Sequence, residues 1–298
     1  MTTSRDTRAL VALTGAGVLW GLTVPASKLS LEWLDATWLT AVRFGLAAPL
    51  LLLLVRVRHA LTPQIVLAGA LGYGVVMLVQ NVGIARTSVG HAALIVGAVP
   101  VLVALFAAGL GRGSAGPLAW TGFVIALAGV GLVAGGGGEG SSLAGDLIVL
   151  ASVAGSSAWI VAQPRLLAGR DPVAVTAVQI GAGAVAVLPF AILLEGAPPA
   201  PTEAGPVLAT LGLALGGTLL AFSLFAYGQA RVPPDLAGAF VNLEPLVGAA
   251  AGAIAFHDPF GPAQIAGGLA IVLGIALGSI RWPPRRRQRR REAVPATG

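Results

Sequence analysis

Long apolar runs, separated by short polar or Pro/Gly-rich breaks, fill almost the whole chain. A bilayer core about 30 Å thick needs roughly 20 apolar residues in a helix that crosses it. Ten such runs predict ten transmembrane helices, near residues 8–28, 36–56, 63–85, 88–110, 116–135, 144–165, 172–194, 205–229, 233–256 and 261–281. The expected fold is an all-α integral membrane protein without a separate soluble domain.

The composition agrees with this fold and excludes several kinds of site. Hydrophobic residues make up 56% of the chain, charged residues 10%, and the mean hydropathy is +0.88, far from the values of an ordinary soluble domain. The chain has no cysteine, which excludes disulfides, thiolate catalysis and Cys-ligated metals. No pair of histidines has metal-ligand spacing, so we expect neither a metal nor a cofactor.

Basic residues are distributed unequally among the predicted loops. If the N-terminus is cytoplasmic, the outer loops hold only Lys28 and Arg86, whereas the inner segments hold Arg5, Arg8, Arg56, Arg58, Arg112, Arg165, Arg170, Arg231 and Arg281. Acidic residues show the reverse bias. The positive-inside rule therefore predicts a multi-pass protein of the cell inner (plasma) membrane with both termini cytoplasmic.

The net charge of +6 comes largely from the C-terminal stretch "RWPPRRRQRRR". Such a stretch can bind anionic lipid headgroups or RNA. The other basic residues are spread over loops of one side of the membrane, which favours lipid. We therefore expect the tail, residues 285–298, to contact lipid headgroups, and we expect no nucleic-acid partner.

The two halves of the chain match each other. At a shift of 145 residues, "ARTSVGHAALIVGAVPVLVAL" from Ala85 falls on "ARVPPDLAGAFVNLEPLVGAA" from Ala230. The same shift aligns two glycine pairs, Gly122 with Gly267 and Gly129 with Gly274. Nearer the N-terminus the shift is smaller, and Trp20 falls on Trp159.

This match predicts two homologous five-helix halves, residues 1–137 and 138–284. Because five is odd, the second half must enter the membrane upside down, which gives an inverted repeat. The first helix resembles a signal peptide in composition, but its partner lies inside the second half, so we expect no cleavage.

Several motifs, in this order and in duplicate, carry a resemblance to a known family: Trp20-Gly21 ahead of Lys28, "RFGLAA" from Arg43, Ala93 with Pro100, Gly238 with Pro245, and "DPFGPAQIAGG" from Asp258. Over about Ala9 to Ile280 the chain resembles the EamA-type transporters of the drug/metabolite transporter superfamily, which have ten helices in a five-plus-five inverted repeat. Asp258 replaces the family's usual Glu, and Gly113 occupies the equivalent place in the first half. If that acid caps the last helix, the fifth helix lacks such a cap.

The resemblance implies a secondary transporter of small metabolites that works by alternating access and exports amino acids or related compounds. The sequence contains no nucleotide-binding "GxxxxGK[ST]" motif, and the glycine run "GGGGEGSS" is interpreted as a loop between the halves. A passive channel remains an alternative. An intramembrane enzyme is a further one, but Ser156 and Ser157 lack a histidine at comparable depth, so we expect no enzyme.

Glu244 is the one acid in the apolar stretch "AGAFVNLEPLVGAAAGAIAF". Eleven helical residues from Pro233 place it about 16 Å deep, near the bilayer midplane. A charge there is costly, so the side chain should face a cavity or a partner, or be protonated. Two interpretations stay open: a site for a proton or a substrate ammonium, and a neutral structural residue beside the Pro245 kink.

Other polar or aromatic residues inside the spans are candidates for the substrate cavity: Trp20, Gln80, Asn81, Trp159, Gln163, Tyr227 and Asn242. Trp20 and Trp159 occupy equivalent positions, but either could serve packing alone. Arg43 is a possible charge partner of an acid or a substrate carboxylate, or it reaches back to the membrane surface. The pattern predicts surface positions for His91 and His257.

Pairs of glycines with GxxxG spacing, such as Gly248 with Gly252 and Gly212 with Gly216, permit close helix crossings. We interpret them as internal packing contacts. The protein is therefore expected to be a monomer or a weak homodimer that binds a small-molecule substrate.

Overall fold

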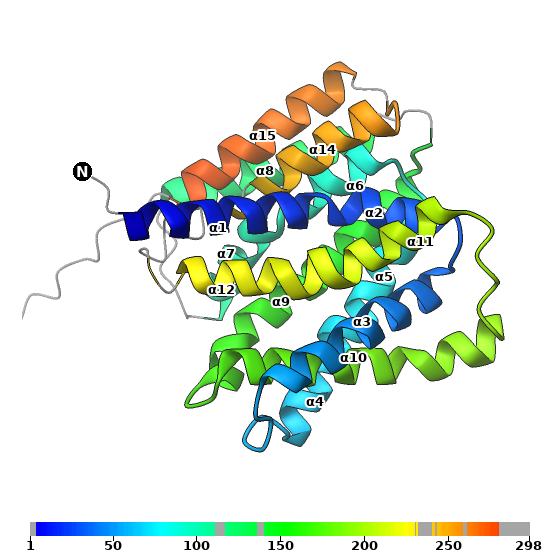
Figure 1. The fold of residues 1–298 in the computed structure, drawn as a ribbon. Helices are drawn as coiled ribbons and strands as arrows, with labels where there is room; N and C mark the ends of the chain where they lie inside the picture. The colour runs from blue at the N-terminus through cyan, green and yellow to red at the C-terminus, as the bar shows by residue number, and fades with distance from the viewer. Residues whose placement is uncertain are drawn as a thin grey trace, which may run out of the picture.

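The computed structural model describes residues 4–110, 117–135, 140–229, 231, 240–241, 243–258 and 261–279, and within these ranges every regular element is a helix (Figure 1). The first half contains α1 (Ser4–Gly21), α2 (Thr23–Ser30), α3 (Ala36–Leu54), α4 (Pro63–Gly69), η1 (Ala70–Val75), α5 (Val76–Ala85), α6 (Val89–Val96), α7 (Val99–Gly109) and α8 (Pro117–Gly135). The second half contains α9 (Leu143–Leu167), α10 (Pro172–Glu195), α11 (Ala204–Leu211), η2 (Gly212–Leu220), α12 (Ala221–Gln229), α14 (Leu243–Ala255) and α15 (Pro262–Ser279).

Seven helical stretches in the described part of the chain are long and apolar enough to cross a membrane: Thr7–Ser30, Ala36–Leu54, Pro63–Ala85, Val89–Ala107, Leu143–Leu167, Pro172–Glu195 and Ala204–Phe225. Three shorter apolar helices accompany them, Trp120–Gly135, Leu243–Ala255 and Pro262–Leu277. The chain is therefore an all-helical, multi-pass membrane protein. Each of the ten predicted runs contains a helix.

Prolines explain two of the breaks between consecutive helices. Pro25 has no N–H to bond the carbonyl of Gly21, and α1 gives way to α2 at Leu22. Pro100 likewise leaves the carbonyl of Val96 without its helical donor, at the break between α6 and α7.

Two stretches contain π-helical segments in their middle, η1 and η2. A π-helical turn holds one more residue than an α-helical turn and shifts the side chains that follow it around the axis. In η2 the hydroxyl of Thr218 donates to the carbonyl oxygen of Leu213, 3.0 Å away. Both segments face the interior site described below.

α8 and α15 lie side by side and cross at glycines (Figure 1). A Cβ atom on Gly129 would lie 2.6 Å from the carbonyl oxygen of Gly267, and one on Gly274 would overlap the carbonyl oxygen of Gly122. Only glycine permits backbones to approach so closely. The crossing therefore holds the fifth and tenth predicted runs together.

Two further pairs of helices from different halves pack against each other, α3 with α10 and α6 with α14. In the second pair Gly248 faces Ala93 and Gly252 faces Gly90, which confirms the predicted internal packing of this GxxxG pair. Gly212 has no atom of another helix within 4 Å of its Cβ position, so the packing predicted for it is wrong.

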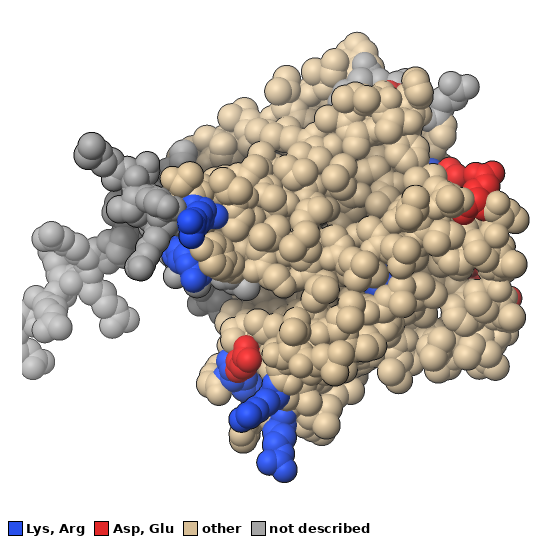
Figure 2. All heavy atoms as spheres, viewed as in Figure 1, with Lys and Arg blue, Asp and Glu red and all other residues tan. Residues whose placement is uncertain are grey.

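Charged side chains concentrate at the two ends of the bundle. Figure 2 shows Lys and Arg gathered where α1 begins and α12 ends and around the lower connections, with Asp and Glu mainly at the opposite end. The surface between them is almost free of charge in this view. This band matches the apolar core of a bilayer.

Candidate functional site

A cavity of about 480 Å³ lies in the interior, between helices of both halves of the chain. This volume falls within the range of about 300–1,000 Å³ that is usual for small-molecule sites. Most of its lining is apolar. The polar side chains that line it are Thr23, Ser27, Arg43, Tyr73, Gln80, Ser156 and Glu244.

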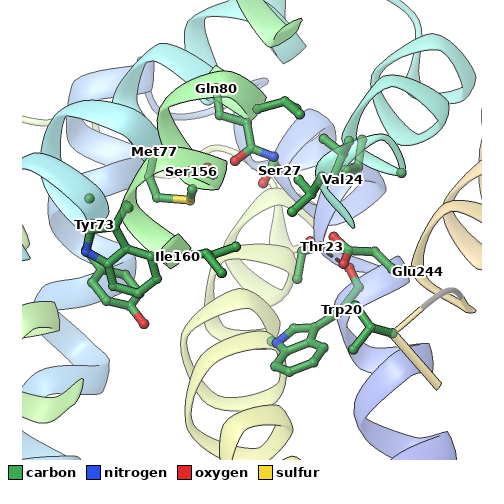
Figure 3. A pocket seen from close by; sticks show the side chains of 18 of the residues that line it. Trp20, Thr23, Val24, Ser27, Tyr73, Met77, Gln80, Ser156, Ile160 and Glu244 are labelled. Carbon is green, nitrogen blue, oxygen red and sulfur yellow. Dashed lines mark hydrogen bonds between the residues drawn. The ribbon is translucent and has the colours of Figure 1, made fainter. Parts of the chain in front are cut away.

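Five of the residues singled out from the sequence line this cavity: Trp20, Arg43, Gln80, Trp159 and Glu244. Figure 3 shows Glu244 and Trp20 reaching into it from one side, opposite Tyr73 and Ile160, while Gln80 points in from its far end. Their positions in the chain are up to 224 residues apart, as Trp20 and Glu244 are. The fold therefore brings together side chains that the sequence keeps separate.

Aromatic rings form a continuous wall along the cavity. The ring centroid of Tyr73 lies 5.1 Å from that of Trp159, 5.6 Å from that of Phe44 and 6.4 Å from that of Phe222. Trp20 continues the wall, with its centroid 5.3 Å from that of Phe222. These edge-to-face contacts hold the rings in fixed orientations.

Arg43 and Glu244 face the same cavity but do not form a direct ion pair. Among the described residues the one ion pair within 4.0 Å joins His91 and Asp146. No hydrogen bond from a protein group to the Glu244 carboxylate is found in the described part of the chain. An acidic and a basic side chain thus line one interior space without contacting each other.

The guanidinium of Arg43 is held in place by η2. Its Nε donates to the hydroxyl of Thr218, 3.2 Å away, and a Cβ on Gly217 would lie 3.7 Å from its Nη2. Thr218 is fully buried. Arg43 therefore lines the cavity instead of reaching the membrane surface, and its role as a charge partner stays a prediction.

Two predicted cavity residues lie elsewhere. Asn81 is buried and its Nδ2 donates to the hydroxyl of Thr40, 2.9 Å away, so it joins α5 to α3. Tyr227 is 40% exposed, and its ring lies 3.7 Å from the guanidinium carbon of Arg231. Both side chains are outside the lining of the cavity.

Gln163 also lies outside the lining, and its amide is paired with that of Gln179. Its Nε2 donates to the Oε1 of Gln179 at 3.0 Å, and the Nε2 of Gln179 donates back to the Oε1 of Gln163 at 3.1 Å. The pair satisfies two amides between α9 and α10. Asn242, the last of the predicted cavity residues, lies outside the described residues.

His91 is buried, with 3% of its surface exposed, so the surface position predicted for it is wrong. Its Nδ1 lies 2.9 Å from Asp146 Oδ2, and its Nε2 lies 3.0 Å from the Nε2 of Gln264. The hydroxyl of Thr87 donates to the other oxygen of Asp146. These partners compensate for the loss of water on burial. His257 is exposed, as predicted.

Asp258 bonds to the start of another helix. Its Oδ2 accepts from the backbone N–H of Gly90 at 2.6 Å, at the start of α6 in the other half. Close by, the ammonium of Lys28 donates to the carbonyl oxygens of Ile84 and Thr87, at 3.1 and 2.7 Å. A carboxylate at a helix N-terminus and an ammonium at a helix C-terminus both complement the helix dipole.

Sequence patterns do not reveal several of the residues that line the site. Tyr73, Phe222 and Phe225 look like ordinary apolar-face aromatics in the sequence, although all three line the cavity. Gln264 could have been singled out from the sequence, because it lies in the motif "DPFGPAQIAGG". Asp146 gave a weaker indication, because it is an acid in the first turn of a predicted span.

Comparisons with known proteins agree on the class of protein. The chain is 28% identical over 254 residues to the "Uncharacterized inner membrane transporter YedA" of Escherichia coli (strain K12), covering 80% of this chain and 81% of the relative. An "Uncharacterized transporter" of Archaeoglobus fulgidus is 24% identical over 282 residues, covering 91% and 96%. One solved crystal structure, described only as that of a protein, shares the fold with a TM-score of 0.66 at 22% identity, over 92% of this chain and 96% of that one.

A family model matches the chain twice, once over residues 7–135 and once over residues 143–280. Its description is the EamA-like transporter family, and together the two matches cover nearly the whole chain. The names of the relatives point in the same direction, to a membrane transporter. The chain therefore belongs to the EamA-like transporter family.

Proposed function

We propose that this protein is a secondary transporter that exports zwitterionic metabolites, such as amino acids, by alternating access. The observation that carries the proposal is that Arg43 and Glu244 line one cavity without a direct ion pair between them. A zwitterion offers one group of each sign. It therefore complements both residues at once.

The chemistry of the cavity supports this substrate class. The substrate ammonium would bind to Glu244 and its carboxylate to Arg43, since charge-assisted hydrogen bonds are the strongest that side chains offer. The apolar part of the substrate would lie against the aromatic wall of Trp20, Tyr73 and Trp159. An alternative role for Glu244 is to bind a proton that drives transport.

The proposal includes ten membrane-spanning helices arranged as two inverted five-helix halves. The glycine crossing of α8 and α15 supports it, because the repeat match pairs Gly129 with Gly274 and Gly122 with Gly267. Exchanging the halves therefore turns the contact of Gly129 with Gly267 into the contact of Gly274 with Gly122, and both contacts exist. The two successive matches to one family model are consistent with the same repeat.

We further propose that both termini are cytoplasmic, in the inner membrane of the cell. The separation of basic and acidic side chains to opposite ends of the bundle supports this orientation. The basic tail, residues 285–298, would then contact anionic headgroups of the inner leaflet. The end of the bundle where α2 ends and α6, α9 and α15 begin would face the outside.

Counterflow in proteoliposomes tests the proposal. Vesicles are loaded with one unlabelled amino acid at a time, and uptake of the same labelled amino acid is followed. A carrier shows saturable uptake that is accelerated by the internal substrate, whereas a passive channel shows no acceleration. For each amino acid that exchanges, its decarboxylated amine and its deaminated acid are then added as competitors.

A zwitterion site predicts that both competitors bind at least about tenfold more weakly than the amino acid, because each leaves one charged group of the cavity unpaired. Equal competition by the amine would reduce the site to a cation site at Glu244. Absence of counterflow for every amino acid would overturn the substrate class. Direction is tested separately, by the resistance of overexpressing cells to toxic amino-acid analogues.

A further inference from the structure

Four buried polar side chains form a cluster that the proposed substrate site does not use. We call Thr87, His91, Asp146 and Gln264 the polar cluster; each is at most 5% exposed. It lies at the end of the bundle where α6 and α9 begin. Seven residues beyond Asp146, about 10 Å along α9, Val153 already lines the cavity.

The hydrogen bonds of the cluster are mutually consistent. The Nε2 of Gln264 can only donate, so the Nε2 of His91 accepts from it. The proton of the neutral ring is then on Nδ1, which donates to Asp146 Oδ2, while Thr87 donates to Oδ1. Both carboxylate oxygens and both ring nitrogens have partners. Breaking such a buried network leaves polar groups unpaired, which is unfavourable.

The cluster joins the two halves of the chain to each other. Thr87 and His91 belong to residues 1–137, and Asp146 and Gln264 belong to residues 138–284. The neighbouring bond from Gly90 to Asp258 also crosses between the halves. Any motion that separates the beginning of α6 from the beginning of α9 must therefore break the bonds of Thr87 and His91 to Asp146.

The repeat aligns the polar cluster with positions that carry different residue types. The shift of 145 residues aligns Thr87, His91 and Gln264 with Val232, Leu236 and Ala119, and the smaller shift of the first helix aligns Asp146 with Thr7. Three of these four positions carry apolar side chains. In an inverted repeat the two access states are related by exchange of the halves. Side-chain hydrogen bonds like those of the polar cluster cannot form at the three apolar positions that the repeat aligns with it.

We propose that the polar cluster is a lock that keeps the cavity closed to the outside, so that the transporter without substrate rests in its inward-open state. The proposal rests on alternating access and on the orientation given above, but not on the identity of the substrate. The hydrogen bonds of the lock then stabilise the inward-open state relative to the outward-open state. Export would begin from the state in which the empty cavity meets the cytoplasm.

The absence of cysteine in the chain permits a direct test. Ser156→Cys places one thiol in the lining of the cavity, and a membrane-impermeant maleimide is applied to right-side-out and to inverted vesicles without substrate. Asp146→Asn replaces one acceptor oxygen by a donor, and Thr87→Val removes a hydroxyl at nearly equal volume. The matched control is Asp35→Asn, the same change at the same end, because the Asp35 side chain makes no capping hydrogen bond.

With the lock intact we expect labelling from the cytoplasmic side only. Either cluster variant should raise the labelling rate from the outside at least about threefold and lower it from the inside, because a lost hydrogen bond shifts a two-state equilibrium by this order. Asp35→Asn should leave both rates unchanged.

Unchanged rates in folded cluster variants, or an equal rise from both sides, would overturn the lock. Loss of folded protein in both variants would assign the cluster to stability and would overturn it as well. Labelling does not depend on transport, so failure of the lock is distinguishable from failure of the proposed function, which appears as absent counterflow in the wild-type protein.

Discussion

The indole nitrogen of Trp159 donates a hydrogen bond of 3.1 Å to the carbonyl oxygen of Ala68, directly before the π-helical segment η1. The ring of Trp159 also lies against Gly72, where a Cβ atom would overlap the indole. A wall residue from the second half is thus fitted to the backbone of the first half. This contact fixes one side of the cavity.

Gly72→Ala should therefore displace Trp159 and destabilise the protein. Overpacking of this kind costs about 1–3 kcal/mol, so we expect a clear drop in melting temperature, measured by size-exclusion chromatography of heated, detergent-solubilised samples. Gly45→Ala is the matched control, because a Cβ there meets nothing within 4 Å. An equal effect of the two substitutions would show that the contact with Trp159 does not contribute to stability.

Glu244→Gln keeps the shape of the side chain but cannot ionise. If Glu244 binds the substrate ammonium, the variant should fold normally and lose both gradient-driven transport and counterflow, with apparent affinity weakened about tenfold or more. If it only couples protons, counterflow without a gradient should survive. Glu203→Gln, at an exposed position, is the control. Wild-type behaviour in both assays would leave Glu244 as a neutral structural residue beside Pro245.

Arg43→Gln should weaken binding of the amino acid while leaving binding of its decarboxylated amine almost unchanged, because only the carboxylate loses its partner. The ratio of the two inhibition constants measures this effect and is insensitive to general damage. Arg58→Gln, on the surface, should change neither constant. An equal loss of affinity for both ligands in Arg43→Gln would mean that the guanidinium supports the fold and does not bind the substrate carboxylate.

Gly129→Ala should destabilise the crossing of α8 and α15, by an amount on the order of 1–3 kcal/mol, because its Cβ would press on the carbonyl of Gly267. Gly131→Ala lies on the same helix, where a Cβ meets nothing within 4 Å, and should be neutral. The melting temperatures of the two variants, measured side by side, check this expectation. Equal melting temperatures would show that the close crossing of α8 and α15 does not contribute to stability.

Topology can be read with reporters. A reporter fused after Gly298 should be cytoplasmic, and one inserted into the loop of residues 135–142 should be outside, because the proposed topology places five membrane-spanning helices between the N-terminus and that loop. Alkaline phosphatase and a fluorescent protein, active on opposite sides, distinguish the two outcomes. Both insertions on the same side would contradict the five-plus-five inversion.

Much of the helical layout could be predicted from the sequence, because the length of an apolar run is set by the bilayer and is local. The sequence also singles out Glu244 as a candidate, because an acid in an apolar run needs a cavity, a partner or a proton. The burial of His91 could not, because its partners Asp146 and Gln264 lie 55 and 173 residues away. The π-helical segments were also missed, since they change the register of helices whose composition is ordinary.

The glycine crossing has a consequence for how such a chain could arise. Each half carries both glycines that the crossing needs, Gly122 and Gly129 in one and Gly267 and Gly274 in the other. Two copies of either half, inserted in opposite orientations, would present these same surfaces to each other. A gene for five helices could therefore duplicate and fuse without having to evolve a new contact between its products.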